Sequence, residues 1–73
     1  MSTAAAEAAE RAARTSYGRL VALLAARSGD LALAEDALSA AFEQALVTWP
    51  ADGVPRNPDG WLLTVARNRQ RDA

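Results

Sequence analysis

The stretch AEDALSAAFEQALVTW, residues 34–49, decides the fold of this chain. Apolar side chains recur in it at the i, i+3, i+4, i+7 spacing that places them on one face of an α-helix. They are Ala34, Ala37, Leu38, Ala41, Phe42, Ala45, Leu46 and Trp49. The remaining positions include Glu35, Asp36, Ser39, Glu43 and Gln44. We therefore predict an amphipathic helix with an acidic outer side, in which Phe42 and Leu46 are among the main core residues.

The residues before this stretch also predict helix. Residues 1–14 are rich in alanine and contain two favourable i, i+4 pairs, Glu7–Arg11 and Glu10–Arg14, so we expect a helical segment that frays towards Met1. An apolar stripe with helical spacing follows, formed by Tyr17, Leu20, Val21 and Leu24. Gly18 lies within it and predicts a kink or a close contact.

Short connections define the ends of the expected helices. Gly29 suits the position just after a helix, and Asp30 suits the N-cap of the next, so the two helices should form an antiparallel pair. We predict that the central helix ends at Trp49, because Pro50 cannot continue it. A proline-containing loop then leads to Asn57, the expected N-cap of a last helix with Pro58 in its first position.

These elements predict an all-α fold, a small three-helix domain made of the antiparallel helix pair and a third helix after the proline-rich loop. Trp61, Leu62, Val65 and Ala66 form the inward stripe of that last helix. We treat residues 1–73 as one domain. The chain ends within an arginine-rich pattern without a helix cap, which we interpret as a fragment of a longer chain, and such a fragment could self-associate.

Composition excludes several classes of function. The 73 residues contain no cysteine and no histidine, which rules out thiolate and imidazole chemistry, disulfides and most transition-metal sites. We expect no catalytic residue, no metal and no cofactor. No apolar run is long enough to span a membrane, and the lack of cysteine fits the cytoplasm.

The charges argue against a protein that holds duplex DNA alone. The net charge is −1, whereas phosphate neutralisation needs a basic surface. The distribution is nevertheless uneven, because the central helix is acidic and the last one is rich in arginine.

The sequence resembles region 2 of the extracytoplasmic-function sigma factors, the small sigma-70-family subunits of bacterial RNA polymerase. The resemblance runs from about Tyr17 to Asp72 and depends on LAEDALSAAF, on the WPADGVP loop and on WLLTVARNRQRD. It implies binding of core polymerase and recognition and melting of the promoter minus-ten element. It also implies an anti-sigma regulator as a candidate partner, whose identity the sequence leaves open.

The resemblance assigns roles to three segments. The outer side of the acidic helix is expected to dock on the coiled coil of the polymerase β′ subunit. In this sequence that side consists of Glu35, Asp36, Ser39 and Glu43. Family members commonly carry Gln-Glu where this chain has Ser39-Ala40, so one usual amide contact is missing. From the residues alone, a solvated helix face is the alternative.

The loop and the last helix are expected to meet promoter DNA. The resemblance makes the 50–57 loop the receptor of a flipped base, with Asp52, Val54 and Arg56 as pocket formers. On the last helix Asn68 is the expected base reader, with Thr64 as a second candidate. The expected phosphate contacts are Arg67, Arg69 and Arg71.

From the residues alone, each of these two segments also has a purely structural interpretation. The loop could be an ordinary helix–helix connection, and the arginines could serve solubility and a helix C-terminus. A helical protein–protein interaction or dimerisation module without DNA binding is therefore the alternative function.

Overall fold

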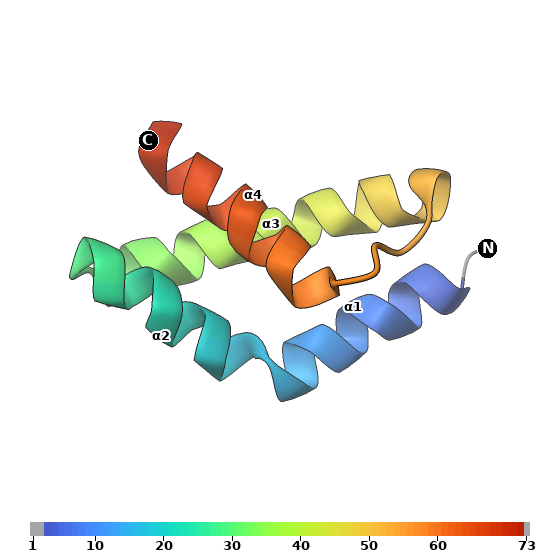
Figure 1. Cartoon of the computed structure of the whole chain (residues 1–73), viewed down its shortest axis with the longest axis horizontal. Coiled ribbons are helices and arrows are strands. Elements are labelled where there is room, and N and C mark those ends of the chain that lie inside the picture. Colours follow the sequence, from blue (N-terminus) through green and yellow to red (C-terminus); the bar gives the residue numbers. More distant parts are fainter. Residues whose placement is uncertain (1–2, 73) are drawn as a thin grey trace.

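The computed structural model describes residues 3–72, which form four α-helices and no strand (Figure 1). The helices are α1 (Thr3–Thr15), α2 (Tyr17–Ser28), α3 (Leu31–Asp52) and α4 (Pro58–Asp72). The all-α prediction is confirmed. The fraying expected at Met1 lies outside the described residues.

The N-terminal segment forms a separate helix that adds to the predicted three. Four small side chains of α1 are buried against the rest of the molecule: Ala5, Ala8, Ala9 and Ala12. The chain bends at Ser16, which is only 7% exposed and donates a hydrogen bond of 2.8 Å to the Asp59 carboxylate at the start of α4. The kink or close contact predicted at Gly18 is wrong, because Gly18 is exposed within α2 and a Cβ there would meet no atom within 4 Å.

The turn between α2 and α3 follows the sequence prediction. Gly29 has a positive φ of 72°, which glycine adopts without strain, and its N–H donates to the carbonyl of Ala25 at 2.7 Å. The Asp30 carboxylate accepts a hydrogen bond of 3.0 Å from the N–H of Leu33, as an N-cap residue does. The short connection leaves α2 and α3 running in opposite directions (Figure 1).

The predicted end of the central helix at Trp49 is wrong, since α3 continues through Pro50 to Asp52. Proline lacks an N–H and so removes one backbone hydrogen bond, but its φ is compatible with a helix. The N–H of Gly53 donates to the carbonyl of Trp49 at 2.8 Å and closes the last turn. The helix ends where Gly53 takes a φ of 95°.

Most of the predicted apolar stripe of α3 is buried, but two of its large residues are not fully inside. Phe42 is half-buried and stacks on Tyr17 of α2, with ring centroids 6.2 Å apart. Leu46 is 58% exposed, so its assignment to the core was wrong. It follows Ala45, which is completely buried, and one residue of helix rotates a side chain by about 100°. That step turns Leu46 outward.

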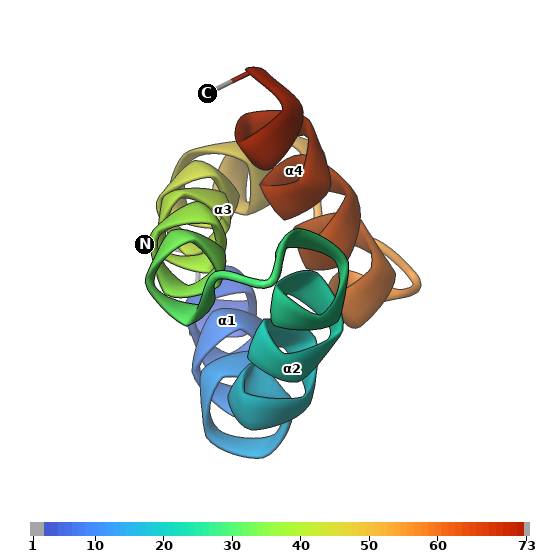
Figure 2. The ribbon, with the colours of Figure 1, turned by 90° about the vertical axis from the view of Figure 1, so that its left-hand side faces the viewer.

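Helix α4 returns across α3 and completes the core (Figure 2). Its buried residues are Leu62 and Ala66, and Trp61 meets the buried Trp49 edge to face at 5.4 Å. The predicted N-cap is confirmed, because the Asn57 side chain accepts a hydrogen bond of 3.0 Å from the N–H of Gly60. Within residues 3–72 no helix is long and apolar enough to cross a membrane.

Candidate nucleic-acid and polymerase interfaces

Helix α4 presents one row of polar side chains on its exposed side. Thr64, Arg67, Asn68 and Arg71 follow the spacing of a single helical face, and all four are exposed. The buried stripe of Leu62 and Ala66 holds the helix against the core and so fixes which side faces outward.

The start of α4 is anchored by Asp59. Its carboxylate accepts hydrogen bonds from the Ser16 hydroxyl, between α1 and α2, and from the Arg19 guanidinium on α2. The carboxylate also lies in the first turn of α4, where negative charge interacts favourably with the helix dipole. This contact links three helices and sets the position of the row that begins at Thr64.

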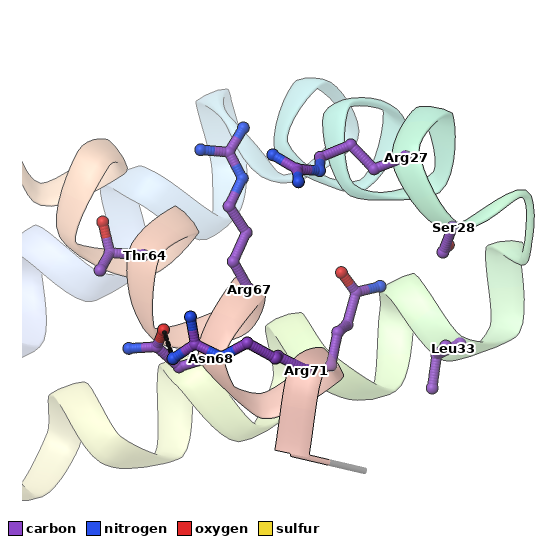
Figure 3. A pocket seen from close by; sticks show the side chains of 8 residues that line it. Arg27, Ser28, Leu33, Thr64, Arg67, Asn68 and Arg71 are labelled. Carbon is purple, nitrogen blue, oxygen red and sulfur yellow. Dashed lines mark hydrogen bonds between the residues drawn. The ribbon is translucent and has the colours of Figure 1, made fainter.

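The row of α4 lines one side of a pocket of about 520 Å³ (Figure 3). The opposite side comes from the end of α2 and the beginning of α3. The lining residues are Arg27, Ser28, Leu33, Thr64, Arg67, Asn68, Gln70 and Arg71. The pocket therefore brings together four of the predicted DNA-contacting residues.

Asn68 and Arg71 are joined directly within this pocket. The Arg71 guanidinium donates a hydrogen bond of 2.9 Å to the side-chain carbonyl of Asn68, one helical turn earlier (Figure 3). This bond engages the acceptor of the amide and leaves its NH₂ group as a donor.

The pocket is positively charged. Three arginines line it, and no carboxylate is found among the lining side chains that the structure describes. Among the described side chains, the ion pairs join Arg14 to Glu10 and Arg19 to Asp59, and neither involves an arginine of the pocket. An unbalanced group of guanidinium ions fits an anionic partner, and their planar forks match phosphate oxygens.

Four predicted DNA contacts do not line this pocket. Asp52, Val54, Arg56 and Arg69 are all exposed but lie outside its lining. Asp52 is the last residue of α3, so the loop proper begins three residues later than predicted. The loop joins the start of α4 while Asn68 is near its end (Figure 1), and ten helical residues separate Pro58 from Asn68 by about 15 Å.

The outward side of α3 is a separate surface. Its predicted docking residues, Glu35, Asp36, Ser39 and Glu43, are all exposed. None of the three carboxylates takes part in an ion pair of the described side chains. Towards the end of the helix the same side becomes apolar, because Leu46 and Val47 are 58% and 71% exposed.

Sequence reasoning missed part of both surfaces. Arg27 was given no role, and Leu46 was assigned to the core. The position of Arg27 in the last turn of a predicted helix was visible, but only the crossing of α4 over α2 and α3 brings it near Arg67. Gln70 was likewise missed: it lines the pocket, and its buried Nε2 has no hydrogen-bond partner among the described residues.

Comparison with known families identifies the domain. The family model described as sigma-70 region 2 matches residues 12–73, from the last turn of α1 through α4. The chain belongs to the sigma-70 region 2 family. The resemblance inferred from the sequence is thus confirmed at this level. A region 2 domain has a role in RNA polymerase binding and promoter recognition, and it is a transcription-factor domain, not a catalytic one.

A curated relative adds similarity over a shorter stretch. The region 2 domain is 49% identical over 39 residues to an uncharacterized protein of Rhizobium meliloti (strain 1021). The alignment covers 53% of this chain and 9% of the relative, so the chain spans less than a tenth of that protein. No solved structure matches the chain.

Proposed function

We propose that this region 2 domain belongs to an extracytoplasmic-function sigma factor, docks on the coiled coil of the polymerase β′ subunit through α3, and reads and helps to melt the promoter minus-ten element through α4 and the preceding loop. Such a domain acts in the cytoplasm, where bacterial polymerase transcribes.

The observation that carries this proposal is the separation of two surfaces of opposite charge. The outward side of α3 carries unpaired carboxylates, whereas the row on α4 carries unpaired arginines around an exposed amide. A protein that must bind a basic polymerase segment and an anionic DNA strand at the same time needs such a separation, because complementary charge guides each partner to its own side. The net charge of −1 explains why DNA affinity would require polymerase.

On α3 the proposed docking residues are Glu35, Asp36, Ser39 and Glu43. The exposed Leu46 and Val47 continue the same side and would add apolar contact at the end of the interface. The carboxylates would speed and orient association, while the apolar pair would lower the dissociation rate once the surfaces meet.

On the DNA side we assign Asn68 and Thr64 to base reading, and Arg67, Arg69 and Arg71 to phosphate. Asp52, Val54 and Arg56 remain the proposed loop contacts. The end of the loop and Asn68 are about 15 Å apart along α4. The loop and Asn68 would therefore read different promoter positions.

The alternative function, a protein-interaction or dimerisation module without DNA binding, has one observation in its favour. Leu31, Leu46 and Val47 are large apolar side chains that are more than half exposed on α3. This apolar surface would fit a protein partner. The protein-interaction function does not, however, explain the arginines of the pocket.

A titration of fluorescent single-stranded minus-ten oligonucleotides tests the proposal, with and without core polymerase. We expect sequence-dependent anisotropy only when polymerase is present. If the chain forms dimers by sedimentation, fails to bind core polymerase and gives no DNA signal in either condition, the protein-interaction module replaces the sigma-factor function.

A further inference from the structure

Two arginines from different helices line the same pocket. Arg27 lies in the last turn of α2 and Arg67 belongs to α4, and Figure 3 shows both side chains extending into the same region of the pocket. Like charges repel, and the described side chains that line the pocket include no carboxylate to balance them.

The rest of the lining consists of groups that suit a nucleotide. Thr64 offers a hydroxyl group, and Asn68 offers the NH₂ group left over from its bond with Arg71, whereas the Ser28 hydroxyl already donates to the carbonyl of Asp30. The amide nitrogen of Gln70 is a further donor, which is buried at the pocket and has no hydrogen-bond partner among the described residues. These donors add to the three arginines of the lining, so the site favours an anion. A volume of about 520 Å³ lies within the range of small-molecule sites.

We infer that Arg27 and Arg67 together hold a single phosphodiester of the DNA strand, so that α2, which no family assignment above includes, forms part of the DNA interface. This inference rests on the proposed function. One phosphate between two guanidinium groups would remove their repulsion and receive planar, bidentate donors from both sides. The Thr64 hydroxyl, one turn before Arg67, could also donate to one of the two charged oxygen atoms.

A double-mutant cycle distinguishes a shared phosphate from two independent contacts. Affinity of the polymerase holoenzyme for a single-stranded minus-ten oligonucleotide is measured for wild type, Arg27→Ala, Arg67→Ala and the double variant at several salt concentrations. We expect each single variant to lose about fivefold in affinity, which is the contribution of a well-formed exposed charge contact. The loss of affinity in the double variant should be clearly smaller than the product of the two single losses. The slope of log affinity against log salt concentration should fall by about 0.7 in the double variant, the value for one phosphate of a single strand.

Matched variants exclude simpler causes. Arg14→Ala removes the same charge from α1, far from the pocket, and should leave the affinity and slope at wild-type values. Arg27→Lys keeps the charge and should restore most of the slope but not the full affinity, because ammonium lacks the planar fork. Circular dichroism checks that helicity is retained, as expected for an exposed side chain.

Three results would overturn the inference while leaving the proposed function intact. The first is an Arg27→Ala variant that binds like wild type while Arg67→Ala is weakened. The second is a pair of losses that multiply, which would mean separate phosphates. For the third, binding of inorganic pyrophosphate to the chain is measured directly. An Arg27→Ala variant that loses pyrophosphate binding but keeps its DNA binding would show that the pocket holds a free phosphate compound and not the DNA strand. A wild-type holoenzyme that binds no promoter strand would overturn both.

Discussion

The side-chain carbonyl of Asn68 accepts a hydrogen bond of 2.9 Å from the guanidinium of Arg71, one turn further along α4. The proposed base reader is therefore held in one orientation by a proposed phosphate-binding residue. A rotamer fixed before binding costs less entropy on association than a free one. The bond also divides the two ends of the amide, because the carbonyl faces Arg71 and the NH₂ group remains for the base.

This division predicts how substitutions at Asn68 should behave. Asn68→Ala should relax the preference at a single promoter position by about 1–3 kcal/mol. Asn68→Asp keeps an acceptor for Arg71 but loses the donor, so it should lose the same preference. The measurement is holoenzyme affinity for a set of single-base promoter variants. An Asn68→Ala variant that weakens every promoter variant equally would show that Asn68 is not a reader.

Substitution of Arg71 should have a different signature. Arg71→Ala removes a phosphate contact, so it should weaken all promoter variants alike and lower the salt slope by about 0.7–0.9. It also frees the Asn68 carbonyl, and we expect a small additional loss of base preference from the less ordered amide. Salt titrations with the same set of promoter variants test this. A variant with the wild-type slope would contradict the phosphate assignment.

The acidic side of α3 predicts a salt-dependent loss of polymerase binding. Asp36→Arg should weaken capture of the β′ coiled coil without lowering helicity, because the residue is exposed. The difference from wild type should shrink at high salt, since ions screen exposed charges. Glu7→Arg makes the same change on α1, away from this side, and serves as the control. Undiminished capture of the coiled coil by Asp36→Arg at low salt would indicate a solvated face.

The core predicts opposite outcomes for two leucines of the same helix. Leu38 is completely buried, so Leu38→Ala should cost about 2–5 kcal/mol, enough to unfold much of so small a domain. Leu46 is mostly exposed, so Leu46→Ala should change the free energy of unfolding by less than about 0.5 kcal/mol. Urea denaturation followed by circular dichroism compares them. Equal losses would place Leu46 in the core after all.

The Asp59 contact predicts a cost for disconnecting α4 from the bend between α1 and α2. Asp59→Ala leaves the Ser16 hydroxyl, in a residue 7% exposed, without its charged acceptor, so we expect a loss of about 1–3 kcal/mol in thermal denaturation. Arg19→Ala should cost less, about 0.2–1 kcal/mol, because the Arg19 side chain is 65% exposed. A larger loss for Arg19→Ala than for Asp59→Ala would reverse this ranking of the two contacts.

By itself the sequence determined the elements with strong local signals. The helical period of residues 34–49, the glycine after α2 and the capping residues Asp30 and Asn57 were predicted correctly, because each depends on contacts within a few residues. The family was also visible in the sequence, since its motifs are linear. The exposure of Asn68 and Arg71 followed from the same period.

Only the tertiary structure decided the remaining features, because each depends on residues distant in the chain. The bend falls at Ser16 and not at Gly18 because Asp59, 43 residues later, holds the Ser16 hydroxyl. Leu46 faces outward because α4 and α1 pack on a buried face centred on the alanines of α3, and a few tens of degrees of helix rotation decide between core and surface. Arg27 and Arg67 line one pocket because α4 crosses back over the α2–α3 turn. The sequence near either arginine does not predict that crossing.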